Sequence, residues 1–515
     1  MLTLFKNLFY KTFNSKYRIL DIGIFVGYAI FTFLLVLRHE PYMDEAHCWL
    51  IARDSISIIH LIKLIPWTGQ PILWNFILFP FAHLGFPFIL QQLLTWVAAV
   101  LMVGIFVFRS PFPRFVKYAF VFSFWAIYEY VAVARNYGLT AALLFLVAVM
   151  YKDRFQKPIL YAVFVALLFN SHFFMFFISS ALVGVYAWEM IQDKKITKKT
   201  LMALSLMCLT GFFCFFTGTI FPEGHLQYKE IVIPNFTYPA EIFSRAFFPQ
   251  EIFSSFSLSA ISAGIILLIS FFLLARMPIP FFILNVCFWG SWYISAFRFH
   301  EFGDRHCGLV LMQFIFVLWL TYLYKPMIVK TKFLQWINRI SFKKIRILIL
   351  ILLALALGFS VQRSYLCARL DWQYPFSASR QMASFIKEMP EGVVANKIIV
   401  GFPPASMAPV SIYLPDWKFW YPDIEDFGTY YMLSSYRDSK KGMSPTEIIG
   451  TAGKRFGDLS KIFFLFPRPL EAKHAFGYEF YLVKAASPFL VGYGGEKYFL
   501  YKPVFVGPFN KNTVK

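Results

Sequence analysis

Acidic, basic and imidazole side chains gather at four places in an otherwise apolar sequence. The clusters are residues 38–47 with Asp44 and Glu45, residues 129–137 with Glu129 and Arg135, residues 170–172 with His172, and residues 298–306 with Asp304, Arg305 and His306. A carboxylate within hydrogen-bond reach of a hydroxyl group can take its proton. The planar guanidinium of arginine can bind two phosphate oxygens at once. If the clusters lie together, they predict attack by a hydroxyl acceptor on a donor whose leaving group is a phosphate, stabilised electrostatically.

The composition indicates which elements must position these residues. Of 515 residues, 58% are hydrophobic and 15% charged, whereas about a quarter are charged in a soluble domain. The apolar residues form blocks of about 15–22, which predict membrane-spanning helices because a hydrocarbon layer offers backbone groups no other partner. We predict about eleven spans, at 19–37, 87–108, 116–133, 138–151, 159–171, 173–190, 201–221, 257–275, 279–297, 308–324 and 347–361. The short apolar piece 71–85, interrupted by Pro80, predicts a re-entrant or interfacial helix.

The positive charge predicts the orientation. With the N-terminus in the cytoplasm, the cytoplasmic loops hold about 22 Lys and Arg and the opposite loops about 8, as the positive-inside rule requires. This topology places all four clusters on the non-cytoplasmic face. The net charge of +21 lies in short loops rather than on a basic module, so we predict a lipid bilayer as partner and no nucleic acid.

The end of the chain has a different character. Residues 362–515 contain no spanning block and carry the turn residues of a soluble domain. Apolar runs at 397–402, 462–466 and 479–483 predict strands, and 379–389 predicts a helix. The expected architecture is an all-α polytopic membrane domain at 1–361, followed by a soluble, non-cytoplasmic α/β domain at 362–515. A disulfide among Cys48, Cys307 and Cys367 is left open.

Three short motifs resemble one enzyme family. Residues 42–46 (YMDEA) are similar to the acidic signature of the GT-C glycosyltransferases, and residues 69–73 (GQPIL) and 134–139 (ARNYGL) match further motifs. The nearest pattern is that of the protein O-mannosyltransferases and of the bacterial transferases that put aminoarabinose on lipid A. The resemblance covers about residues 15–190, and 298–361 more loosely. It implies inverting transfer of a sugar from a polyprenyl-phosphate donor. A bacterial inner (cytoplasmic) membrane is the expected location, chiefly because the sequence shows no retention signal for the endoplasmic reticulum.

The same resemblance implies roles for individual residues. Asp44 matches the catalytic base and Glu45 its acidic neighbour, so both are expected as catalytic residues. The residues implied for the donor phosphate are Arg305, His306 and Arg135, and those implied for placing the acceptor or a metal are Glu129, His172 and Asp304. No cofactor is assigned with certainty, and a divalent cation is left open. The segment after Gln70 lacks both the His-Pro-Pro of the mannosyltransferases and the Lys of the lipid A enzymes, so a lipid, a glycan and a protein remain open as acceptors.

Simpler interpretations stand beside these roles. Asp44 and Glu45 could charge the start of an interfacial helix, and Arg305 could anchor a helix at the membrane interface. Glu129 and Arg135 could pair with each other, and His172 could be satisfied by a backbone carbonyl. The rival function is a transporter or flippase of polyprenyl-linked glycans, although its polar residues would usually lie at the middle of the membrane.

Overall fold

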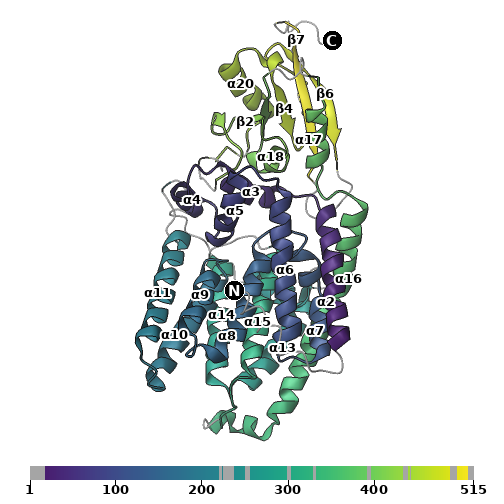
Figure 1. The fold of residues 1–515 in the computed structure, drawn as a ribbon. Helices are drawn as coiled ribbons and strands as arrows, with labels where there is room; N and C mark the ends of the chain where they lie inside the picture. Colours follow the sequence, from purple (N-terminus) through teal and green to yellow (C-terminus); the bar gives the residue numbers. More distant parts are fainter. Residues whose placement is uncertain are drawn as a thin grey trace.

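The chain consists of a long helical bundle with a smaller sheet-containing part at one end (Figure 1). The computed structural model describes residues 18–219, 223, 237–249, 256–297, 303–328, 332–390, 396–432, 436, 439–440, 442–471, 473–487 and 496–507. Residues 298–302 of the fourth polar cluster lie outside the described residues.

The bundle follows the apolar blocks of the sequence. Its helices are α2 (Arg18–Arg38), α6 (Ile89–Arg109), α7 (Arg114–Val121), α8 (Tyr137–Met150), α9 (Pro158–Phe169), α10 (Met175–Gln192), α11 (Lys198–Thr219), α12 (Thr237–Phe247), α13 (Phe256–Leu274), α14 (Pro278–Phe297), α15 (Asp304–Leu320) and α16 (Phe342–Gln373). Short 3-10 helices, η3 (Tyr151–Asp153) and η4 (Lys332–Arg339), precede α9 and α16. Within the described residues five helices, α2, α6, α10, α11 and α16, are long and apolar enough to cross a membrane. The chain is therefore an integral membrane protein, and the expected number of about eleven crossings stays a prediction.

The expected span 116–133 is not one continuous helix. α7 ends at Val121, and a π-helical turn, η2 (Trp125–Glu129), follows it. Ser360 and Ser364 of α16 compensate for the break: the Phe124 N–H donates to Ser360 Oγ at 3.0 Å, and Ser364 Oγ donates to the Phe122 carbonyl at 3.1 Å. Such side-chain partners allow a broken helix inside a membrane protein. The prediction of one continuous helix was wrong here. Side chains of the distant helix α16 make the hydrogen bonds that the broken backbone needs, and this leaves no local signal in the sequence.

A layer of short helices lies between the bundle and the sheet-containing part (Figure 1). It comprises α3 (Met43–Asp54), α4 (Ile58–Leu64), η1 (Ile65–Trp67) and α5 (Leu73–His83). α5 confirms the short helix expected at 71–85 and contains Pro80. Ala46 and Leu50 of α3 are buried in a cluster with Trp74 and Leu78 of α5 and with Ala408 of the C-terminal part. This packing fixes α3, which carries Asp44 in its first turn.

The C-terminal part confirms the expected α/β class. α16 continues past residue 361 to Gln373, and the helices that follow are α17 (Ser379–Lys387), α18 (Pro404–Ser411), α20 (Pro445–Phe456) and η5 (Leu459–Lys461). The strands are β1 (Ile398–Gly401), β2 (Lys418–Tyr421), β3 (Asp426–Phe427), β4 (Phe463–Phe466), β5 (His474–Ala475), β6 (Tyr478–Ala486) and β7 (Tyr498–Phe505). They form one sheet of order β3-β2-β1-β4-β7-β6-β5, in which β1 is parallel to β2 and β4 and the other pairs are antiparallel.

The two faces of the sheet are both covered. Ile399 belongs to one buried cluster and its neighbour Val400 to another, as expected when successive side chains of a strand point to opposite faces. Val400 pairs with Trp420 of β2 and with Phe464 of β4. The strands expected at 397–402, 462–466 and 479–483 are thus confirmed as β1, β4 and part of β6.

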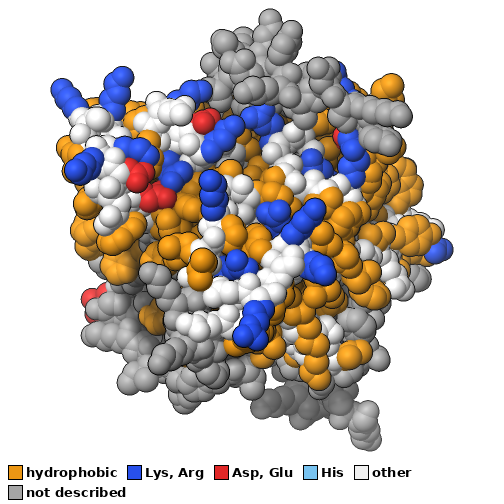
Figure 2. All heavy atoms as spheres, turned by 90° about the horizontal axis from the view of Figure 1, so that it is seen from below, with side chains coloured by type: hydrophobic (Ala, Val, Ile, Leu, Met, Phe, Trp, Pro, Cys, Tyr) orange, Lys and Arg blue, Asp and Glu red, His pale blue; other side chains and the backbone are white. Residues whose placement is uncertain are grey.

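The end of the bundle opposite the sheet is rich in basic side chains. Lys and Arg gather there among apolar residues, with few Asp and Glu (Figure 2). Two ion pairs join helix ends in this region: Asp21 with Arg114 at 3.1 Å, and Glu189 with Arg154 at 2.5 Å. The distribution matches the loops expected on the cytoplasmic side, and the orientation in the membrane remains a prediction.

Candidate active site

Four segments that are distant in sequence meet at the end of the bundle beneath the sheet. Asp44 on α3 contacts Arg305 at the start of α15 and lies 3.6 Å from Arg135, which precedes α8. The Tyr137 hydroxyl lies 3.1 Å from His306 Nε2, and the rings of Tyr137 and His172 are 5.1 Å apart. The expectation that these polar clusters share one end of the bundle is therefore confirmed by their contacts.

Asp44 is the centre of the site. Its Oδ2 accepts a hydrogen bond from Arg305 Nη2 and another from the Tyr42 hydroxyl at 3.2 Å. The same hydroxyl accepts from Arg305 Nη1, so Tyr42 bridges the base and the cation. Arg135 Nη1 donates to the backbone carbonyl of Asp44 at 2.7 Å. The carboxylate lies in the first turn of α3, where the helix dipole also favours a negative charge.

The charge of Asp44 is strongly stabilised. Burial alone would raise the pKa of Asp44, but the charges of Arg305 and Arg135 outweigh it and lower this pKa to about 2. The side chain keeps 17% of its surface exposed, so it is accessible from one side. In this resting arrangement Asp44 is a weak base. An anion that takes its place on Arg305 would free an oxygen of the carboxylate and raise its basicity.

The two arginines have unused hydrogen-bond donors. The Nε atoms of Arg135 and Arg305 are both buried and make no hydrogen bond in the described part of the chain. Asp44 offsets part of their positive charge, and Glu129 also acts on Arg305. Because guanidinium groups in a partly buried setting bind phosphate oxygens well, the arrangement is suited to an anionic ligand.

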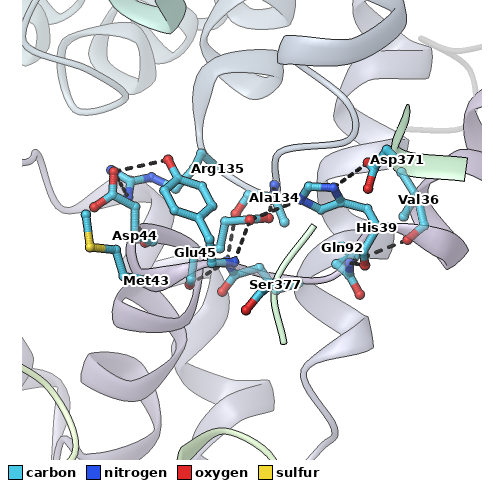
Figure 3. A network of polar contacts seen from close by, with 12 residues as sticks. Val36, His39, Met43, Asp44, Glu45, Gln92, Ala134, Arg135, Asp371 and Ser377 are labelled. Carbon is cyan, nitrogen blue, oxygen red and sulfur yellow. Dashed lines mark hydrogen bonds and ion pairs between the residues drawn. The ribbon is translucent and has the colours of Figure 1, made fainter. Parts of the chain in front are cut away.

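Glu45 has a different role from its neighbour. It is fully buried; Oε1 accepts from the Ala134 N–H at 2.5 Å, and Oε2 accepts from the Tyr42 N–H at 3.1 Å and lies 3.2 Å from His39 Nε2 (Figure 3). Both oxygens are therefore engaged with protein groups. The expectation that Glu45 is a catalytic carboxylate is not supported by this placement, and it is better described as a residue that positions the segments around Asp44.

An aromatic and imidazole cluster lies beside the arginines. His172 Nδ1 accepts from the Phe174 N–H at 3.2 Å, so its partner is a backbone N–H rather than the carbonyl considered from the sequence. Burial, together with the charges of Arg135 and Arg305, lowers the pKa of His172 to about 3, which keeps the ring neutral. His172 and His306 have their ring centroids 5.7 Å apart. These neutral rings can contact a sugar that lies next to the arginines.

Asp304 does not face Asp44. Its Oδ1 accepts from Arg245 Nε of α12 at 2.9 Å, and its Oδ2 contacts Arg363 of α16. Asp304 thus joins three helices, and its expected role in placing an acceptor is not supported. Glu129, at the end of η2, is 1% exposed, and it lies close enough for its charge to act on Arg305.

The sequence left open a divalent cation and a disulfide. Within the ranges that the structure describes, no group of three His, Cys, Asp or Glu side chains is arranged to hold a metal ion. The six cysteines are free thiols, so Cys48, Cys307 and Cys367 form no disulfide.

The C-terminal part covers α3 through residues that no sequence motif singled out. The Tyr431 ring stacks on His47 of α3 with centroids 4.1 Å apart, and Glu496 Oε1 accepts from the Met43 N–H at 2.8 Å. Thr429 contacts Asp54 at the other end of the helix. These residues lie in loops without a recognisable motif, so only the folded arrangement brings them to the site.

Comparisons with known proteins add one likeness. The sequence matches no protein family and no curated protein. The structure is similar to that of ArnT from Cupriavidus metallidurans, solved bound to undecaprenyl phosphate. The match has a TM-score of 0.47 and 9% sequence identity, and it covers 94% of this chain and 97% of that chain. The likeness is in the overall fold.

Proposed function

We propose that this protein is an inverting membrane glycosyltransferase of the GT-C type. It takes a sugar from a polyprenyl-phosphate donor and transfers it to a hydroxyl group of an acceptor on the non-cytoplasmic face. The observation that carries the proposal is the position of Asp44 between Arg305 and Arg135 at the end of the bundle. This reaction needs a base for the acceptor hydroxyl and cations for the donor phosphate, and these three residues can supply both.

The donor binds when its phosphate takes the place of the Asp44 carboxylate on Arg305. Its phosphate replaces Asp44 on Arg305 and uses the free Nε donors of Arg305 and Arg135. Charge-assisted hydrogen bonds to phosphate are among the strong ones, and they offset the loss of the pair between Arg305 and Asp44. The apolar tail of such a donor stays in the membrane, next to the bundle.

The transfer then follows from the released carboxylate. Asp44 takes the proton of the acceptor hydroxyl while the acceptor oxygen forms a bond to the anomeric carbon. The bond between that carbon and the phosphate oxygen breaks, and polyprenyl phosphate leaves with the electron pair. Arg305 and Arg135 stabilise the negative charge that develops on it. Attack from the side opposite the phosphate inverts the anomeric configuration.

The rival function is a transporter or flippase. A transporter would place its ionisable residues in the middle of the bundle. In this structure Asp44, Arg135 and Arg305 lie at helix starts and loops near the sheet-containing part, which favours an enzyme.

A direct test compares two substitutions at opposite ends of α3. The Asp44→Asn variant, purified in detergent and given a polyprenyl-phosphate sugar, should lose transfer by a factor of about 10² to 10⁴, the usual contribution of a general base. Asp54→Asn is the matched control, because Asp54 pairs with Arg53 away from the site. Transfer is measured as sugar bound covalently to the acceptor, by mass spectrometry. Near wild-type transfer by Asp44→Asn would contradict the mechanism, and lipid movement in vesicles without any transfer would favour the flippase.

A further inference from the structure

Three buried titratable groups behind Asp44 have no part in the chemistry proposed above. His39 follows α2, Glu45 lies on α3 and Asp371 lies near the end of α16, and all three side chains are 0% exposed. His39 Nδ1 is 2.6 Å from Asp371 Oδ2, and its Nε2 is 3.2 Å from Glu45 Oε2 (Figure 3). One imidazole therefore bridges two carboxylates from two distant helices.

The arrangement requires a charged ring. A neutral imidazole would point a lone pair at one of the two carboxylates, whereas an imidazolium donates an N–H to each. Burial opposes the charge, but Asp371 and Glu45 outweigh it and raise the pKa of His39 well above its ordinary value. Among the described residues, the Tyr128 hydroxyl donates to Asp371 at 3.3 Å, the Phe376 ring lies 4.9 Å from the His39 ring, and Glu40 is close enough for its charge to interact with His39. Removing one partner of such a buried triad strongly destabilises the folded protein, because it leaves a charge without compensation.

Glu45 connects this bridge to the two segments that carry Asp44 and Arg135. Glu45 Oε1 accepts from the N–H of Ala134, the residue before Arg135, and Oε2 accepts from the N–H of Tyr42, whose hydroxyl contacts Asp44 and Arg305. A single carboxylate thus holds the segment with the base and the segment with the cation. Its orientation depends on His39.

We propose that His39 is a positioning residue, which bridges Asp371 and Glu45 as an imidazolium and thereby fixes the separation of Asp44 and Arg135. Its effect on turnover rests on the proposed function, but its effect on the two segments does not. In this way Asp371 of α16 supports the segments that carry Asp44 and Arg135, through side chains that are fully buried. A displacement of about 1 Å in such a site can reduce turnover about 100-fold.

The test uses a readout that needs no activity. In full-length protein in detergent, hydrogen–deuterium exchange of peptides containing Tyr42 and Ala134 should become faster in His39→Gln than in wild type. Tyr28→Phe is the matched control, because it removes another buried hydrogen bond of α2, 2.9 Å long, to the Ala126 carbonyl. This control should leave exchange at both peptides unchanged. Asp371→Asn keeps the volume of the side chain, and it should accelerate the same two peptides if His39→Gln does not fold.

Turnover gives the second readout. For variants that transfer sugar, kcat should fall about 10- to 100-fold while KM for the donor changes much less. Unchanged exchange at both peptides in the two bridge variants would overturn the proposal, and so would equal acceleration in Tyr28→Phe. If wild type shows no transfer at all, the proposed function fails while the exchange measurement still decides the role of His39.

Discussion

Replacement of Arg305 by alanine tests the donor site most selectively. The side chain is 15% exposed and contacts both Tyr42 and Asp44. With the donor bound, it would instead hold the phosphate through charge-assisted hydrogen bonds, each of which contributes about 1.5–3 kcal/mol. Loss of the guanidinium should therefore weaken binding by about 3 kcal/mol, which is roughly 100-fold in Kd.

The assay is binding of polyprenyl phosphate without a sugar, measured by native mass spectrometry or by calorimetry in detergent. Arg305→Lys should bind with intermediate affinity, because lysine keeps the charge but lacks the planar fork. Arg53→Ala is the control, since Arg53 pairs with Asp54 at the far end of α3. If Arg305→Ala binds the lipid phosphate as well as wild type, or if Arg53→Ala weakens binding equally, the reasoning about this site is refuted.

Two further predictions concern stability. Asp304→Asn leaves Arg245 and Arg363 without their shared carboxylate. The substitution should lower the free energy of unfolding by about 3 kcal/mol, which is visible as a clearly lower Tm in detergent. An unchanged Tm would contradict the role of Asp304 in joining the three helices. Burial raises the pKa of Glu496 to about 7, although its hydrogen bonds oppose the shift. The folded state therefore holds this proton more tightly than the unfolded state, and stability should decline as pH rises from about 4.5 to 7. Glu496→Gln should reduce this decline in Tm, and an equal pH dependence in wild type and variant would argue against it.

Much of the fold could be predicted because the membrane imposes simple rules. The apolar blocks predicted α2, α6 and α10 closely, since a helix is the only way to satisfy the backbone in hydrocarbon. The break between α7 and η2 could not be predicted, because it depends on Ser360 and Ser364 of α16. The helix that Asp44 and Glu45 could begin was only an alternative interpretation from the sequence, and α3 bears it out. Its burial could not be predicted, since it comes from packing against α5 and the C-terminal part.

The meeting of the polar clusters was predictable from the sequence, whereas the surroundings of each residue were not. The expected topology predicted that Asp44, Arg135 and Arg305 lie at the same end of the bundle, and the structure places them in contact. Residue types alone did not show that Glu45 is fully buried while Asp44 stays partly exposed, because adjacent residues on a helix point in different directions and the packing decides which one is buried. His39 and Asp371 were not singled out, since their partnership joins positions 332 residues apart.

The exchange of anions at Arg305 is measured most directly by a structure of the protein with polyprenyl phosphate bound. The phosphate oxygens should lie about 2.7–2.9 Å from nitrogens of Arg305 and Arg135, and Asp44 should no longer contact Arg305. If the pair between Asp44 and Arg305 is intact while the lipid phosphate is bound elsewhere, the proposed mechanism is contradicted.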